Sequence, residues 1–309
     1  MSLPEQGCLA CASGSENESC LGSFARIGVV RAHWDCWDRC NLSCAFCFRS
    51  RSDPIDTNKA RLLLGALAYS GVTHMVFTGG DPSLRKDLSQ LITYAKSFGM
   101  FVEVLTNAHH RPDELAAVLS EADLVGVSLD GATADIHDQF RNKKDNFKRV
   151  NRLLDLLDSQ GKPYIVRTII SAENAASIPA MADAMHSRKM LTRWGIQQFS
   201  PVEEGYVNRD RYAISDVEYR SVVSVLMNSA SQELKPKIST LSVDDRIGLY
   251  LLLNPAGAVF GRDHSTEDGT FPTVGSVFTD HLFDLSEALS FDRGKHELRY
   301  ANWFKQDSR

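Results

Sequence analysis

The sequence lacks the features of several common protein classes. It has no basic segment followed by an apolar run near its start, and no apolar stretch approaching the roughly 20 residues that span a bilayer. We therefore expect neither a secretory signal nor a membrane segment. Positive charge is not in excess, since the formal net charge is −5, and this argues against a dominant nucleic-acid-binding surface.

Cysteine is absent from the whole chain after Cys47, although the sequence contains 7 cysteines. Thiols gathered at one end, in a chain without an export signal, favour metal ligation in a reducing cytoplasm over a disulfide framework. The 309 residues, 43% hydrophobic and 24% charged, fit a soluble barrel-sized domain with an appendage. We expect a cytoplasmic protein.

Three of the cysteines form the motif Cys40-x3-Cys44-x2-Cys47. Three thiolates on one short loop can bind three irons of a [4Fe–4S] cube and leave the fourth iron without a protein ligand. Clusters that only carry electrons usually have four cysteine ligands, so an open iron suggests chemistry. The alternatives are a zinc site, or three buried thiols that pack as small hydrophobes. Zinc would need a fourth ligand, and no histidine lies between His33 and His74.

The other four cysteines form a second candidate site: Cys8, Cys11, Cys20 and Cys36. The Cys8-x2-Cys11 step can chelate a metal, and four thiolates could bind an auxiliary cluster or a zinc ion. In the alternative interpretation, the first residues are a flexible leader with incidental cysteines. Cys36 is then a buried neighbour of the main cysteine loop.

Apolar runs alternate with helical patterns over much of the chain. We expect strands at 27–34, 74–80, 101–107, 124–131, 164–170 and 193–200, and helices at 59–70, 85–98, 113–122, around 147–157 and at 174–188. Units with this alternation build a parallel sheet. Six repeats predict an α/β fold with a partial (βα)6 barrel of the TIM type. Ligands of such folds bind at the carboxyl ends of the strands, where the following residues fall: Gly79, Gly80, Asn107, Ser128, Asp130 and Gln197.

The pattern changes after Pro201. We expect a helix over 214–227 with an N-cap at Ser215 or Asp216, and two short strands within 249–261 around an Asn-Pro-Ala-Gly turn. The predicted organisation is a cysteine-containing leader over 1–24, a core domain over 25–205 and a small α+β extension over 206–309 that covers the substrate.

Four motifs together resemble the radical S-adenosylmethionine (SAM) enzymes: CNLSCAFC at the cysteines, TGGDP (78–82), TN (106–107) and SLDG (128–131). The resemblance covers about residues 27–205. It implies that SAM chelates the open iron, and that an electron from the cluster cleaves SAM to methionine and a hydrogen-abstracting 5′-deoxyadenosyl radical. The cofactor then supplies the chemistry, while the protein binds, orients and excludes water.

The resemblance also implies roles for residues near the cysteines. Phe46 would lie against the adenine, although it could simply pack the loop. Gly79 and Gly80 would let the backbone approach the cofactor where a Cβ would interfere. Asp81 stands where the family more often has Glu, and it or nearby carbonyls would receive the methionine ammonium group.

Further along the chain, Ser128 and Asp130 are placed to bind the ribose hydroxyls, unless SLDG is a plain strand-to-turn signal. Arg167 would hold the cofactor carboxylate through its planar guanidinium, or else form a surface ion pair. Gln197 or Gln198 is a weaker candidate for the adenine edge. Asn107 follows the third strand and points to the same pocket.

The substrate is less defined. Because no cysteine follows Cys47, the C-terminal auxiliary-cluster domain of many peptide-modifying members is expected to be absent. RWGIQQFSPVEEG (193–205) resembles the viperin-like branch, which makes dehydrated nucleotides, but Gly195 stands where that branch has a lysine. SLDGATADIHDQFR (128–141) is more similar to members that act on peptides.

Three hypotheses follow. The first is a radical SAM enzyme that abstracts hydrogen from a ribosomally made peptide or a natural-product intermediate. The second is a viperin-like nucleotide-modifying enzyme, and the third a non-enzymatic iron–sulfur sensor. The first two imply a small-molecule or peptide substrate and an electron donor such as flavodoxin or ferredoxin, with no membrane or nucleic-acid partner.

Overall fold

The computed structural model describes residues 31–49, 51–261 and 269–300. The predicted leader, with Cys8, Cys11 and Cys20, lies outside these residues. No helix within them is long and apolar enough to cross a membrane.

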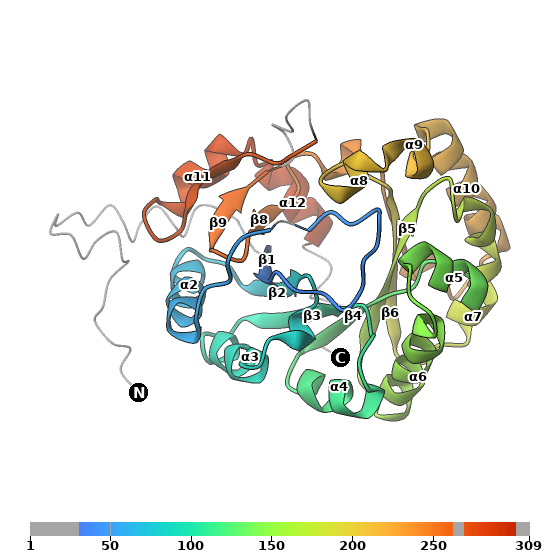
Figure 1. Ribbon diagram of the computed structural model, residues 1–309, viewed down its shortest axis with the longest axis horizontal. Coiled ribbons are helices and arrows are strands. Elements are labelled where there is room, and N and C mark those ends of the chain that lie inside the picture. The colour runs from blue at the N-terminus through green and yellow to red at the C-terminus, as the bar shows by residue number, and fades with distance from the viewer. Residues whose placement is uncertain (1–30, 50, 262–268, 301–309) are drawn as a thin grey trace, which may run out of the picture.

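One curved sheet forms the centre of the described structure (Figure 1). Its order is β10-β9-β8-β1-β2-β3-β4-β5-β6-β7. The core strands β1 to β6 pair in parallel. The strand bounds are β1 (Arg31–Trp37), β2 (His74–Gly79), β3 (Phe101–Thr106), β4 (Leu124–Ser128), β5 (Tyr164–Ile170), β6 (Leu191–Gln198), β7 (Ile238–Leu241), β8 (Leu251–Leu253), β9 (Ala258–Phe260) and β10 (Thr273–Ser276).

The six predicted core strands and the partial parallel barrel are therefore confirmed. The first strand continues to Trp37, past its predicted end, and residues 27–30 lie outside the described part. β1 to β4 are buried along most of their length, as expected for parallel strands with both faces covered.

Residues after 205 extend this sheet at both edges. β7 pairs in parallel with β6, and β8 pairs in parallel with β1, with Ala32 opposite Leu251. The predicted strands within 249–261 are confirmed as β8 and β9, which pair in antiparallel fashion. The Trp34 indole donates to the carbonyl of Asn254 at 3.1 Å and ties β1 to the turn of this hairpin. The division of the chain at residue 205 stays a prediction.

Helices cover much of the outside of the curve (Figure 1). The helix bounds are α2 (Thr57–Tyr69), α3 (Leu88–Ser97), α4 (Pro112–Leu119), α5 (Ala134–Arg141), α6 (Asn146–Ser159), α7 (Ala182–His186), α8 (Glu204–Val207), α9 (Arg209–Tyr212), α10 (Asp216–Ser229), α11 (Leu282–Ala288) and α12 (Arg293–Tyr300). α12 instead lies within the curve, with Tyr300 against Arg31 of β1 (Figure 1). α10 begins with the predicted cap at Ser215, which forms a capping box with Glu218.

One helix prediction needs correction, and one helix was not predicted. The continuous helix expected at 174–188 is instead two 3-10 turns, Ala175–Ser177 and Pro179–Met181, followed by α7. Pro179 lacks the N–H that a continuous helix would use, so the helix cannot run through it. The helix α5 was not predicted, because its eight residues are mostly polar.

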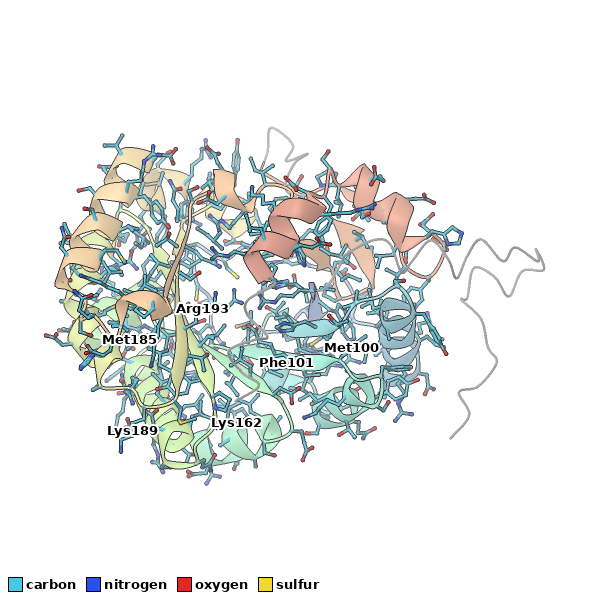
Figure 2. The ribbon with its side chains drawn as sticks, turned by 180° about the vertical axis from the view of Figure 1, so that it is seen from behind. Met100, Phe101, Lys162, Met185, Lys189 and Arg193 are labelled. Atoms are coloured by element: carbon cyan, nitrogen blue, oxygen red, sulfur yellow. The ribbon has the colours of Figure 1, made fainter. Side chains whose placement is uncertain are left out.

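The two ends of the barrel differ. In Figure 1 the segment after β1, which carries the cysteines, crosses in front of the strands at their carboxyl ends. Figure 2 shows the back of the molecule, where Met100, Lys162 and Lys189 lie just before β3, β5 and β6. The candidate site therefore lies at the end that parallel α/β folds use for ligands.

Candidate functional site

Aromatic residues support the cysteine loop. Phe46 stacks on Phe140 with ring centroids 4.1 Å apart, and the Tyr212 ring lies 5.7 Å from it. With Leu42, Cys44 and Phe199, these residues form a small apolar cluster separate from the main core. Phe46 thus packs the loop, as one of its two interpretations proposed, and it also lines the cavity described below.

The three motif cysteines line one cavity of about 380 Å³. The Cys40 Sγ accepts hydrogen bonds from the Leu42 N–H at 3.4 Å and the Asn107 side-chain amide at 3.3 Å. Burial raises the pKa of the Cys40 thiol, and raises that of Cys44 to about 12 although the Arg141 guanidinium opposes the shift. Metal ligation would therefore have to displace protons from these thiols.

The donor set fits the implied cluster. Three thiols on one loop face a common space large enough for a bulky group. No three side chains of His, Cys, Asp or Glu in the described ranges are grouped to hold a single metal ion. A cubane makes a different demand, since each thiolate binds its own iron. Cys40, Cys44 and Cys47 are thus suited to hold it.

The Gly79–Gly80 turn lies against the start of the cysteine loop. A Cβ on Gly80 would stand 2.1 Å from the Arg39 carbonyl oxygen, and one on Gly79 would stand 2.3 Å from that of Trp37. The Gly80 N–H donates to the Trp37 carbonyl at 2.7 Å. The expectation that a Cβ here would enter cofactor space is corrected: it would first collide with the loop backbone. Gly79 also has φ +131°, which disfavours other residues.

A second cavity, of about 250 Å³, adjoins the first, and Cys47 lines both. Most predicted cofactor residues share its wall: Phe46, Gly79, Gly80, Asn107, Ser128, Arg167 and Gln197. Strand ends from β2, β3, β4, β5 and β6 bring them together. Asp81, Asp130 and Gln198 do not line it.

Asp81 is committed to local structure. It is 1% exposed. One carboxylate oxygen accepts from the Ser83 N–H and hydroxyl, and the other accepts from the Thr106 hydroxyl at 2.9 Å and the Asn107 N–H at 2.8 Å. Asp81 therefore fixes the end of β3 beside the cysteines. This geometry does not favour a direct contact with a cofactor ammonium group.

Asp130 is also fully buried. Its carboxylate accepts from the Arg141 guanidinium at 2.5 Å and from the Ile169 N–H at 2.8 Å. Arg141 lines the second cavity, lies 5.2 Å over the Phe46 ring, and accepts a hydrogen bond from the Cys44 thiol through its carbonyl. Asp130 thus positions Arg141, and we find no ribose-facing role for it in this geometry.

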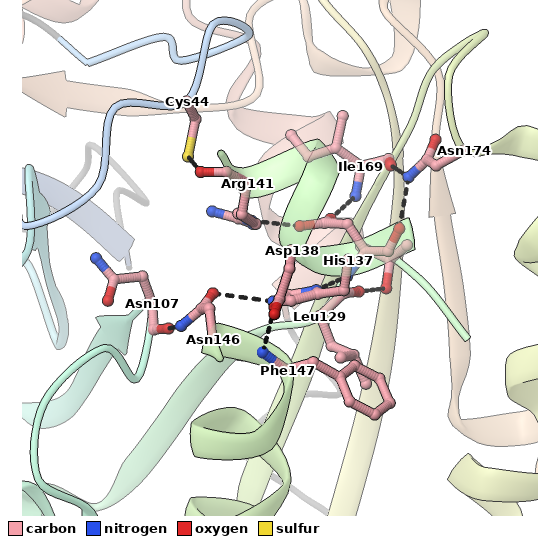
Figure 3. A network of polar contacts seen from close by, with 12 residues as sticks. Cys44, Asn107, Leu129, His137, Asp138, Arg141, Asn146, Phe147, Ile169 and Asn174 are labelled. Atoms are coloured by element: carbon pink, nitrogen blue, oxygen red, sulfur yellow. Dashed lines mark hydrogen bonds and ion pairs between the residues drawn. The ribbon is translucent and has the colours of Figure 1, made fainter. Parts of the chain in front are cut away.

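A chain of hydrogen bonds links Asp130 to the cysteine loop, and Figure 3 shows its part from His137 through Asn146 to Asn107. The Asp130 N–H donates to His137 Nδ1 at 3.1 Å, so the ring proton lies on Nε2, which donates to Asn146 at 2.9 Å. Asn146 in turn donates to the Asn107 carbonyl at 3.0 Å. Burial lowers the pKa of His137, which keeps it neutral in this role. Asn107 completes the chain by donating to Cys40.

Arg167 lies on β5 and donates to the Glu103 carboxylate at 3.0 Å. Arg31 pairs with the same carboxylate, which is fully buried. Burial raises the pKa of Glu103, but the two arginines hold it well below its usual range. The predicted surface pair is therefore wrong, because the pair is internal. Arg167 lines the cavity, and its contact with a cofactor carboxylate stays a prediction.

Gln198 and Cys36 are both buried and have structural roles. Gln198 is 3% exposed, donates to Asp216 at 2.9 Å and accepts from the Val243 N–H, so it holds the start of α10 and the segment after β7 to the end of β6. Cys36 is fully buried in the main apolar core. Burial raises the pKa of its thiol despite the nearby Arg85 guanidinium. This environment matches the interpretation of Cys36 as a buried neighbour.

Sequence reasoning missed three residues of the wall: His33, Arg141 and Tyr250. Arg141 follows His137 by four positions, a spacing that places both on one face of a helix. The spacing could have marked Arg141, because residues 128–141 had already been compared with family members that act on peptides. Tyr250 comes from the far end of the chain, and no local pattern marks it.

Comparison with known proteins agrees with this geometry. The family model "Radical SAM superfamily" matches residues 35–185. The PqqA peptide cyclase of Xanthomonas campestris pv. campestris is 30% identical over 268 residues, covering 82% of this chain and 68% of the relative. The chain belongs to the radical SAM superfamily. The resemblance read from its motifs is thereby confirmed.

Other matches of this radical SAM chain are more distant or shorter. An S-adenosylmethionine-dependent nucleotide dehydratase of Lacinutrix mariniflava is 25% identical over 288 residues, covering 87% of the chain and 58% of the relative. The crystal structure of Streptococcus suis SuiB bound to S-adenosylmethionine has the same fold, with a TM-score of 0.65 at 14% identity over 91% of this chain and 71% of that one. Three other curated relatives match over about half of this chain, which covers 35–41% of their length.

The glycine turn generates a test. Gly80→Ala should lower the iron and sulfide bound after anaerobic reconstitution, because the added Cβ displaces the backbone that carries Cys40. Gly65→Ala in α2 is the matched control, since its added Cβ would make an ordinary van der Waals contact with the Phe98 ring at 3.7 Å. Full cluster content in Gly80→Ala would show that the loop does not depend on this contact.

Proposed function

We propose that this chain is a radical SAM enzyme that holds a [4Fe–4S] cluster through Cys40, Cys44 and Cys47. When bound, the cluster passes an electron to SAM, whose cleavage gives methionine and a 5′-deoxyadenosyl radical that takes a hydrogen atom from the substrate. The observation that carries this proposal is the shared wall: Cys47 lines both the cysteine cavity and the cavity built by the other family motifs.

The chain's own residues bind and orient. Asn107 donates to Cys40 and fixes one thiol, and the Arg141 carbonyl accepts from Cys44 and fixes another. Ser128 and Gln197 offer hydrogen-bonding groups on the wall of the second cavity. Phe46 and Phe199 supply apolar surface beside Cys47, which excludes water from the reacting centre. A sensor would have no need of this second cavity.

We assign the substrate to the peptide and natural-product class. The relative that carries this is the PqqA peptide cyclase, which matches over most of this chain. The nucleotide dehydratase match favours a nucleotide as the second candidate. The viperin-like lysine is absent at Gly195, and for this reason the peptide class is preferred.

The proposal includes an electron donor such as flavodoxin or ferredoxin, and a cytoplasmic location in which these donors are reduced. It also includes a second metal centre, a cluster or zinc, at Cys8, Cys11 and Cys20. Cys36, packed in the core, is not suited to complete that site, so its fourth ligand has to come from elsewhere. The charge and composition give no reason to include a nucleic-acid partner.

The cleavage activity is tested with cysteine variants. The reconstituted, reduced protein should form 5′-deoxyadenosine from SAM, and Cys40→Ala, Cys44→Ala or Cys47→Ala should each abolish this product, because a cube held by two thiolates is lost. Cys36→Ala serves as a control for a nearby buried thiol. Undiminished 5′-deoxyadenosine from a triple Cys40/Cys44/Cys47→Ala variant would overturn the proposal.

The substrate class is tested by deuterium transfer. Deuterated peptide and nucleotide pools are incubated separately with the reduced protein and SAM, and mass spectrometry of 5′-deoxyadenosine shows which pool donates. We expect transfer from peptides. Transfer from nucleotides alone would reassign the enzyme to the second candidate.

The second metal centre is tested by metal analysis of fully reconstituted protein. More than four irons per chain, or four irons and a zinc, are expected, because a leader poor in apolar residues gains its order from a metal. The excess should vanish in a Cys8→Ala/Cys11→Ala variant that keeps SAM cleavage. Four irons and no zinc in the unsubstituted protein would show that the second metal centre does not exist.

A further inference from the structure

Part of the second cavity carries no family motif. This part, called here the His33–Arg246 wall, consists of His33 from β1, Ser200 after β6, Arg246 in the 3-10 turn Asp244–Arg246, and Tyr250 before β8. Residues from both ends of the described chain therefore meet at one surface. None of them has a place in the cofactor site proposed above.

Arg246 is a buried cation held by backbone carbonyls. It is 8% exposed. Its Nε donates to the Ser242 carbonyl at 3.2 Å, and one terminal nitrogen donates to the Gln198 carbonyl. No carboxylate in the described residues forms an ion pair with it. Burial lowers the pKa of Arg246, and the nearby Tyr250 and Asp245 only partly oppose this.

Two polar atoms of the same wall are buried without hydrogen-bond partners among the described residues. They are His33 Nε2 and Ser200 Oγ, on side chains of residues that are 7% and 8% exposed. The His33 ring lies edge-on to Tyr250, 5.0 Å between centroids. Buried polar atoms that lack partners cost free energy, and a ligand in the cavity can supply the missing bonds.

The wall of the whole cavity has more positive than negative groups. Arg141, Arg167 and Arg246 line it, and Asp35 is the acidic residue among its described lining. Arg141 is neutralised by Asp130. Arg167 shares the single carboxylate of Glu103 with Arg31, so that group cannot balance both. Arg246 has no carboxylate partner among the described residues, so a bound anion would balance the charge of this buried side chain.

We propose that the His33–Arg246 wall binds an anionic group of the substrate, a carboxylate or a phosphate, with Arg246 as its ion-pair partner and His33 and Ser200 as hydrogen-bond partners. This rests on the proposed function, because it assigns the part of the cavity that carries no family motif to the substrate. Gly79, Gly80 and Ser128 line the same cavity, so the rest of a substrate anchored here would occupy the space that they line. Arg246 is then a specificity-determining residue.

The proposal is tested by binding without turnover. Reconstituted protein with SAM and no reductant is titrated by ligand-observed NMR with four probes: acetyl-Gly-Glu-Gly-amide, its Gln analogue, uridine triphosphate and uridine. We expect an anionic probe to bind and its neutral partner to bind much more weakly. The Glu peptide identifies a carboxylate as the source of the charge, and the triphosphate identifies a phosphate.

Variants locate the binding site. Arg246→Gln should weaken the anionic probe roughly 10- to 100-fold, since hydrogen bonds to charged groups contribute most to such contacts. Arg246→Lys should recover part of the loss. Arg220→Gln removes an exposed arginine from α10 and is the matched control, which should leave the affinity unchanged. Ser200→Ala should weaken the probe without disturbing the fold, because its hydroxyl bonds to no described residue.

Equal binding of charged and neutral probes, no binding of either anion, or an unchanged affinity in both Arg246→Gln and Ser200→Ala would overturn the proposal. SAM cleavage is measured on the same samples after reduction. Formation of 5′-deoxyadenosine without anion binding would refute this inference and leave the proposed function standing. Anion binding without formation of 5′-deoxyadenosine would refute the proposed function and leave the anion-binding site standing.

Discussion

The close approach of two backbone segments determines where the cysteine loop lies. The Gly79–Gly80 turn touches the backbone of residues 37–39, and two hydrogen bonds, from the N–H groups of Gly80 and Asp81, close the contact. Because no side chain fits between the segments, the loop has little freedom to shift relative to β2. The position of the thiols relative to β2 therefore depends on this contact.

Buried carboxylates fix the positions of residues that line the cavity. Neither Asp81 nor Asp130 lines the cavity. Asp81 fixes the end of β3, and Asp130 fixes the Arg141 side chain. Such groups are costly to bury unless every bond is made, and here their carboxylate oxygens are all occupied. The arrangement resembles the outer shell of a metal site, where residues that touch no ligand orient those that do.

The sequence predicted the features that depend on local patterns. Strand β5 was predicted with its observed bounds, because its apolar run and flanking glycine and proline signals are all local. The gathering of motif residues at one end of the barrel followed from parallel-strand geometry. The inward roles of Asp81 and Asp130 could not be read this way, because they depend on partners such as Thr106 and Arg141 that compete with a ligand for the same oxygens. The pairing of β8 with β1 and the presence of Arg246 and His33 in one cavity lining involve residues too far apart in sequence for any periodicity to reveal.

That pairing has a consequence for how the chain is made. β1 lies between β2 and β8, and the bond from Trp34 to Asn254 spans 220 positions. A ribosome adds roughly 5–20 residues each second, so β1 waits tens of seconds or less with one edge unpaired while the rest of the barrel forms. An apolar strand with an open edge is a site of aggregation. During synthesis, β1 is thus among the last of the described core strands to have both of its edges paired.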